Sequence, residues 1–143
     1  MVIIFKTRSI IFFAACLIIC LAGCNNSSSN SPGQTFLLFW GKIQEGNYTQ
    51  AAQYVSSQTA VEYQTDIPSF LTLMSKGGNP DSISRWTSVK VISEQIDVTK
   101  AVAKVKITAK PDGKETTYDS EMPMSKEDDI WKLRLTSRGY VIQ

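Results

Sequence analysis

The chain has 143 residues, with 15 lysines and arginines, 13 aspartates and glutamates, and no histidine. Without histidine, a serine or cysteine nucleophile lacks its usual general base, and a transition metal lacks its commonest ligand. The formal charge of +2 is too small to favour a protein that binds nucleic acid.

An apolar segment stands near the start of the chain. Lys6 and Arg8 precede an uninterrupted apolar run over residues 10–21. This run is shorter than the roughly 20 residues that a membrane-spanning helix needs, and small residues follow it. The pattern therefore favours a cleaved signal peptide over residues 1–23, with an uncleaved N-terminal anchor as the alternative. Cleavage would remove both basic residues and leave equal numbers of basic and acidic side chains.

The segment from Leu21 to Cys24, Leu-Ala-Gly-Cys, resembles the lipobox of bacterial lipoproteins. The resemblance implies a thioether-linked diacylglycerol on Cys24 and cleavage directly before it. Acyl chains such as palmitate contribute about 0.8 kcal/mol per buried CH2, so two or more chains give durable attachment. The expected location is extracytoplasmic, on the outer membrane or on the outer leaflet of the cytoplasmic membrane. Cys16 and Cys20 would leave with the signal, so no disulfide is expected.

A polar segment separates this expected anchor from one domain. Residues 24–33 are rich in Asn and Ser and predict a lipidated, flexible tether that reaches at most about 30 Å. Residues 34–143 are long enough for a single core and predict a single domain. Ser31 and Gln34 form a capping-box pattern around Pro32, which suits the first turn of a helix.

The first half of the domain carries helical patterns. Phe36, Phe39, Trp40 and Ile43 recur at helical spacing, and Gly46 suits the end of that helix.

Two more helical regions are expected before the middle of the chain. Asn47 can cap the second helix. The third region starts near Thr59, bends at Pro68 and ends at residues 77–80, Gly-Gly-Asn-Pro.

The second half carries strand patterns. Residues 86–96 are rich in β-branched and aromatic side chains, and residues 101–110 alternate between apolar and polar ones. A turn at residues 111–113 precedes a strand over residues 116–124, in which Pro123 indicates an edge or a bulge. A charged turn at residues 126–129 and a strand over residues 131–135 complete an antiparallel meander, and residues 140–142 could extend it. Helices followed by strands indicate an α+β fold with the helices on one face of the sheet.

Four short motifs in this order resemble small bacterial lipoproteins with an NTF2-like domain of the DUF4878 or lumazine-binding-like type. They are the helix start at Ser31, the Gly-Asn-Tyr-Thr-Gln-Ala helix start at Gly46, the Asp-Gly-Lys turn at Asp112, and the Ile-Trp-Lys-Leu strand at Ile130. The resemblance implies a cystatin-like cone, in which a curved four-stranded antiparallel sheet wraps N-terminal helices and leaves a pocket. The superfamily contains both enzymes and non-catalytic binding modules, so the fold does not decide the function.

Three aromatic residues are the candidates for the pocket. The resemblance places Trp40, Tyr63 and Trp86 on elements that border the cavity, where they would suit a small hydrophobic ligand. The alternative is ordinary core packing.

Acidic residues near the third helical region offer a second possibility. Asp66 or Glu62 could act as the general base of an isomerase, with Tyr63 or Tyr118 as an oxyanion donor. Neither acid matches an isomerase motif, and a solvated helix face is the favoured interpretation. An enzyme is therefore not the leading hypothesis, and no cofactor is expected.

Charged residues in the strands and turns allow further interpretations. Five basic side chains share the polar parity of two strands and could face anionic lipid. The favoured interpretation is that they pair across the strands with Asp119 and Glu121. They are Lys104, Lys106, Lys110, Lys132 and Arg134. Residues 127–129, Glu-Asp-Asp, lack calcium-loop spacing, and no metal site is expected.

The sequence thus predicts a membrane-anchored, extracytoplasmic binding module without catalysis. Its partners would be the membrane, through the lipid, and an unknown small hydrophobic ligand or envelope protein, but no nucleic acid. An NTF2-like isomerase or lyase and a structural component of an envelope or secretion complex are the alternatives.

Overall fold

The computed structural model describes residues 30–76 and 83–135. The first helix, α2 (Pro32–Gln44), begins with the predicted capping box. The Gln34 amide donates to Ser31 Oγ at 3.3 Å, and the Ser31 amide donates to Gln34 Oε1 at 3.2 Å. Two amides that have no partner within the helix are thereby satisfied, and Pro32 costs no helical hydrogen bond in this first turn.

The second predicted helix is present but short. Helix α3 (Tyr48–Ala51) begins after Asn47, whose side chain accepts a hydrogen bond from the Gln50 amide at 3.1 Å. The chain then tightens into a 3-10 turn, η2 (Ala52–Tyr54).

The third helical region is two helices, so the prediction of one helix bent at Pro68 is wrong. Helix α4 (Ser57–Tyr63) ends at Gln64, which has a left-handed backbone with φ of 52°. Helix α5 (Ile67–Lys76) then begins anew, with Pro68 in its first turn, where a missing amide hydrogen leaves no helical carbonyl unpaired. A second 3-10 turn, η3 (Ile83–Arg85), leads into the sheet.

The predicted four-stranded meander is confirmed. Strands β1 (Trp86–Asp97), β2 (Lys100–Ala109), β3 (Thr116–Glu127) and β4 (Ile130–Leu133) are antiparallel and lie in chain order. The turn between β2 and β3 is η4 (Pro111–Gly113).

Pro123 lies opposite Val102 of β2, and its carbonyl accepts a hydrogen bond from the Arg134 amide. Arg134 follows directly after β4. Pro123 therefore stands at the limit of the pairing with β4, which agrees with the predicted edge position.

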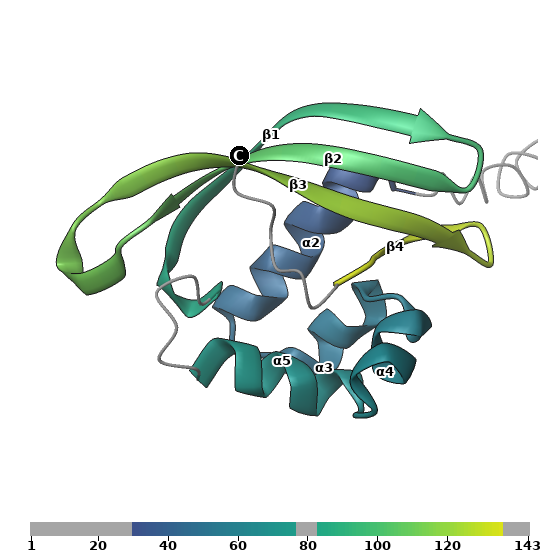
Figure 1. Cartoon of the computed structure of the whole chain (residues 1–143), viewed down its shortest axis with the longest axis horizontal. Helices are drawn as coiled ribbons and strands as arrows, with labels where there is room; N and C mark the ends of the chain where they lie inside the picture. Colours follow the sequence, from purple (N-terminus) through teal and green to yellow (C-terminus); the bar gives the residue numbers. More distant parts are fainter. Residues whose placement is uncertain (1–29, 77–82, 136–143) are drawn as a thin grey trace, which may run out of the picture.

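Helices and sheet form two layers, which confirms the predicted α+β fold. All labelled helices lie on one face of a curved sheet (Figure 1). The pairing of β1 with β2 shifts register around Thr87 and again around Ile92. Such irregularities bend a strand and increase its twist, which curves the sheet around α2.

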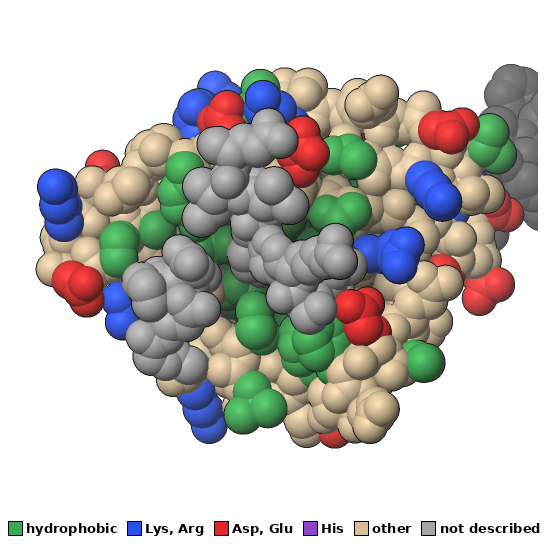
Figure 2. Space-filling model, viewed as in Figure 1, with side chains coloured by type: hydrophobic (Ala, Val, Ile, Leu, Met, Phe, Trp, Pro, Cys, Tyr) green, Lys and Arg blue, Asp and Glu red, His purple; other side chains and the backbone are tan. Residues whose placement is uncertain are grey.

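The core lies between the two layers. Apolar side chains gather there on the face shown in Figure 2. Alternate residues of β2 point into the core, which is why Ala103, Val105 and Ile107 are fully buried. They meet Phe36 and Phe39 of α2, both almost fully buried.

Several sequence predictions fall outside the described residues. They concern the signal peptide, the lipidated Cys24, most of the tether and the strand extension at residues 140–142. Within the described ranges, no helix is long and apolar enough to cross a membrane.

Candidate functional site

A pocket lies at the C-terminal end of α2. It has a volume of about 350 Å³ and is formed by the end of α2, the turn into α3, and the segment that enters β1. The lining residues are Trp40, Ile43, Gln44, Gly46, Tyr48, Ile83, Ser84 and Trp86. Three separate stretches of chain thus converge on one hollow.

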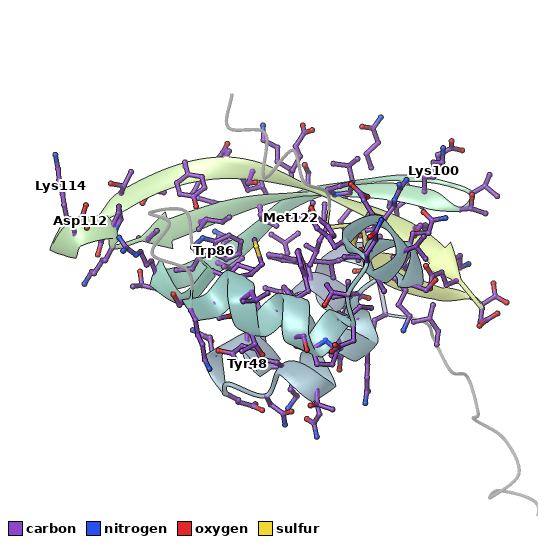
Figure 3. The ribbon with its side chains drawn as sticks, turned by 60° about the horizontal axis from the view of Figure 1, so that its bottom comes forward. Tyr48, Trp86, Lys100, Asp112, Lys114 and Met122 are labelled. Atoms are coloured by element: carbon purple, nitrogen blue, oxygen red, sulfur yellow. The ribbon has the colours of Figure 1, made fainter. Side chains whose placement is uncertain are left out.

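Two tryptophans form the inner wall of this pocket. The Trp40 and Trp86 rings lie 5.5 Å apart between centroids, with their planes inclined by 45°. Trp40 is 7% exposed, Trp86 is 4% exposed, and Ile83 beside them is fully buried. Figure 3 shows Trp86 on the side of the sheet that faces the helices. The wall therefore offers indole faces that the core holds rigidly.

The rim of the pocket is polar and uncharged. Gln44 and Ser84 are exposed and contribute an amide and a hydroxyl group, while the half-buried Tyr48 contributes a phenol. Gly46 takes a left-handed backbone with φ of 69°, which lets the chain turn sharply from α2 into α3. No aspartate, glutamate, lysine or arginine is among the lining residues that the structure describes.

The structure brings together two of the three predicted pocket residues. Trp40 and Trp86 line the pocket, whereas Tyr63 stands at the end of α4 and stacks on Phe70 of α5. Their ring centroids are 4.3 Å apart. Because α4 and α5 are separate helices, the Tyr63 ring packs between them rather than against Trp40.

Side chains fill the middle of the sheet. Met122 and Met124 of β3 and Leu133 of β4 are at most 2% exposed and belong to the same core as α2. Met122, like Trp86, lies on the side of the sheet that faces the helices (Figure 3). The pocket is therefore a hollow at one end of the two-layer core, rather than a cavity along its axis.

Asp66, one of the two candidate bases, has a structural contact. Its carboxylate accepts a hydrogen bond from the Ser69 amide at 2.9 Å, which caps the start of α5. This bond, together with one from the Ser69 side chain, lowers the pKa of Asp66 below its ordinary value. A carboxylate with a lowered pKa is a weaker base, and neither Asp66 nor Glu62 lines the pocket.

Two of the five basic side chains pair across the sheet with Asp119 as favoured, whereas Lys132 donates to the Gln53 carbonyl. Lys106 donates to Asp119 at 2.7 Å, and Lys104 lies 3.8 Å from the same carboxylate. The hydrogen bond from Lys106 and the charges of both lysines hold the pKa of Asp119 below its ordinary value. Lys110 pairs instead with Glu115 at 3.6 Å.

The acidic turn at residues 127–129 has structural contacts. Glu127 accepts a hydrogen bond from the Ser56 hydroxyl at 2.5 Å, while Asp129 lies 3.4 Å from Lys126. Asp128 and Asp129 both have positive φ, as a two-residue hairpin turn requires. In the described residues, no group of three His, Cys, Asp or Glu side chains is arranged to hold a metal.

The sequence pattern did not identify Ile83, Ser84 and Tyr48 as pocket residues. Ile83 and Ser84 belong to a 3-10 turn with no repeating pattern of its own. Tyr48 stands beside the recognised cap Asn47, and it lines the pocket because the chain turns sharply at Gly46.

No known protein family matches the sequence, and no curated protein is significantly similar to it. The similar solved structures include a Campylobacter jejuni protein that is provisionally described as an NTF2-like transpeptidase. It has a TM-score of 0.46 and 13% identity, over 75% of this chain and 100% of that chain. A SEC-C motif containing protein from Rhodopseudomonas palustris has a TM-score of 0.46 and 8% identity, over 71% of this chain and 70% of that chain. Similarity at this level assigns neither a family nor an activity. The layer of helices on a curved sheet is nevertheless the arrangement that the NTF2-like resemblance predicts.

Proposed function

We propose that this protein is a lipid-anchored, extracytoplasmic binding module of the NTF2-like, DUF4878 type, which holds a small uncharged ligand against Trp40 and Trp86. The observation that carries the proposal is the pocket wall formed by these two indole rings. Flat apolar surfaces beside a few hydrogen-bonding groups are typical of small-molecule sites.

The rim supports an uncharged ligand. A charged ligand that enters a partly buried site needs an opposite charge to offset the loss of its hydration. The described lining supplies only the amide of Gln44, the hydroxyl of Ser84 and the phenol of Tyr48. These groups can orient a neutral ring that carries a hydroxyl, carbonyl or amide.

The rim allows a direct test of ligand binding. Equilibrium dialysis of uncharged ring compounds against the full chain should yield ligands that Gln44→Arg weakens by about tenfold or more, because the new side chain narrows and charges the mouth. Gln95→Arg is the matched control, since Gln95 is exposed on β1 and lies outside the pocket lining. If Gln44→Arg and Gln95→Arg bind every ligand equally, the pocket is not the binding site.

The anchor can be tested separately at Cys24. Cells that express the chain in the presence of labelled palmitate should incorporate label into the wild-type protein but not into Cys24→Ala. Only a cysteine thiol can form the thioether, so Cys24→Ser should also lack the label. Label that persists in Cys24→Ala would contradict the assignment of the anchor and leave the pocket proposal unaffected.

A further inference from the structure

The sheet has one face that helices do not cover. Figure 1 shows the labelled helices on the concave side only. In β2, Ala103 and Val105 are buried against the core, whereas Lys104 and Lys106 between and after them are exposed. Strand alternation therefore places the lysines of β2 on the convex face.

This convex face is more basic than the rest of the chain. Strand register and alternation assign it six basic and four acidic side chains. Lys132 donates to the Gln53 carbonyl of the helix layer and Glu127 accepts from Ser56 there, which leaves five basic and three acidic side chains. The remaining basic residues are Lys90, Lys100, Lys104, Lys106 and Arg134, and the remaining acidic residues are Asp97, Asp119 and Glu121. Since the chain after Cys24 has equal numbers of both signs, the excess of two positive charges on this face is matched by a negative excess elsewhere.

Ion pairs within the convex face leave some of its basic side chains without an acidic partner. Asp119 is shared between Lys104 and Lys106, so one carboxylate serves two amines. Lys90 of β1 stands directly opposite Lys106, where two like charges repel each other. Within the part of the chain that the structure describes, Lys90, Lys100 and Arg134 make no ion pair. An anionic surface would relieve this repulsion.

The chain enters the domain beside the same sheet. The Ser31 hydroxyl and the Gly33 amide both donate to Glu94 of β1, at 2.7 and 2.8 Å. The start of α2 is thereby fixed to the edge strand. The stretch from Cys24 to Ser31 spans at most about 25 Å when fully extended. A lipid on Cys24 would hold the sheet within that distance of the headgroups.

We infer that the convex face, centred on Lys90, Lys104 and Lys106, rests on anionic lipid headgroups, so that the helices and the Trp40–Trp86 pocket face the aqueous compartment. The inference rests on the proposed lipid anchor, which supplies the proximity. Each basic residue near an anionic membrane surface contributes about a fivefold preference. The pocket would then take its ligand from solution rather than from the bilayer.

Energy transfer to labelled headgroups tests this orientation. The chain, as purified with its lipid, is reconstituted in vesicles of phosphatidylglycerol and phosphatidylcholine that carry an acceptor dye. A donor is placed at Ser93→Cys on the convex face or at Gln44→Cys on the pocket rim, both exposed positions. Transfer should be stronger from Ser93→Cys than from Gln44→Cys, and the difference should disappear on pure phosphatidylcholine or in about 1 M salt.

Charge variants provide the matched control. The double change Lys90→Gln and Arg134→Gln should shift the equilibrium between the two orientations by about thirtyfold and abolish the difference. The pair Lys42→Gln and Lys76→Gln, on the helices, should preserve it. Equal transfer from both positions on anionic and on neutral vesicles would overturn the inference while leaving the anchor intact. Loss of the wild-type chain from all vesicles would instead refute the anchor, and with it this orientation.

Discussion

At the scale of single residues, two glycines of α2 differ in the space available for a side chain. A Cβ atom on Gly33 would lie 2.3 Å from Glu94 Oε1 and 2.8 Å from Val91 Cγ1. A Cβ atom on Gly41 would meet nothing within 4 Å. Gly33 thus allows the start of α2 to approach β1, whereas Gly41 only adds flexibility to the unfolded chain.

The glycine contrast predicts stability changes of opposite sign. Gly33→Ala should lower the free energy of unfolding by about 1–3 kcal/mol, because Glu94 must move away from the cap that it makes. Gly41→Ala should raise the free energy of unfolding by about 0.5–1 kcal/mol, because alanine has a higher helix propensity than glycine and its Cβ atom would meet nothing within 4 Å. Urea denaturation of the full chain measures both values. Equal destabilisation by the two changes would contradict the close approach of α2 to β1.

Two buried serines allow a second comparison, because only one of their hydroxyl groups has a hydrogen-bond partner among the described residues. Ser120 on β3 is 1% exposed, and its hydroxyl has no hydrogen-bond partner among the described residues. Ser56 is fully buried, but its hydroxyl donates to Glu127. A buried hydroxyl without a partner loses its hydration without compensation.

Ser120→Ala is therefore expected to raise the unfolding free energy by about 1 kcal/mol, and Ser56→Ala to lower it by about 1 kcal/mol. The melting temperatures of the two variants should move in opposite directions. A lower melting temperature for Ser120→Ala would indicate that a water molecule or an undescribed part of the chain satisfies its hydroxyl.

At the scale of elements, carboxylates of the sheet and its turns hold the helix starts in place. Glu94 of β1 accepts from Ser31 and from Gly33, at the start of α2. Glu127 of β3 accepts from Ser56 and, at 3.4 Å, from the Ser57 amide, at the start of α4. A negative charge at a helix N-terminus is favourable, so each glutamate joins a helix to a strand.

Loss of the hydrogen bonds between Glu127 and the start of α4 should be measurable. Glu127→Ala is expected to lower the unfolding free energy by about 1–2 kcal/mol, because α4 loses a charged partner for two donors. Glu121→Ala, a glutamate on the convex face of the same strand, should change it by less than about 0.5 kcal/mol. Amide hydrogen exchange should be faster in α4 for Glu127→Ala alone. Similar exchange in both variants would contradict the claim that Glu127 stabilises the start of α4.

Asp66 should make the stability of α5 depend on pH. Its hydrogen bonds to Ser69 lower its folded pKa below the ordinary value of 3.8. A lowered folded pKa means that the carboxylate stabilises the fold above pH 3.8 and that this contribution is lost as pH falls through the lower folded value. Asp66→Asn should flatten this part of the pH–stability curve. Equal curves for wild type and Asp66→Asn would show that the cap is not formed in solution.

The strands and the first caps were predictable because their signals are local. Alternation in residues 101–110 sets the two faces of β2, and the Ser31 and Asn47 caps act within one turn. The break between α4 and α5 was not predictable, because nothing about glutamine requires the left-handed backbone that Gln64 adopts. Pro68 within a helical pattern predicts a bend, although the first turn of a new helix accommodates proline equally well.

At the scale of the whole molecule, the candidate site depends on how distant elements pack. Trp40 belongs to α2, while Trp86 begins β1, and their contact follows from the docking of α2 on the curved sheet. The family resemblance predicts that both residues border the pocket, but it predicts no contact between their rings. Tyr63 packs on Phe70 instead, because the path of the chain through α4 and α5 depends on the break at Gln64.

The three tryptophans of the chain provide an internal comparison for ligand binding. Trp40 and Trp86 line the pocket, whereas Trp131 of β4 is outside its lining and has Lys126 over its ring at 5.7 Å. A ligand in the pocket should therefore disturb two indole groups and leave the third unchanged. A nonspecific apolar contact would have no reason to discriminate in this way.

Titration of the nitrogen-15-labelled full chain with uncharged ring-containing fragments tests the central claim most directly. The indole N–H signals are assigned with Trp→Phe variants and followed by NMR. The proposed function predicts that at least one fragment moves the Trp40 and Trp86 signals in a saturable way, with no shift at Trp131. Fragments that move all three signals alike, or none of them, would contradict a ligand site at the end of α2.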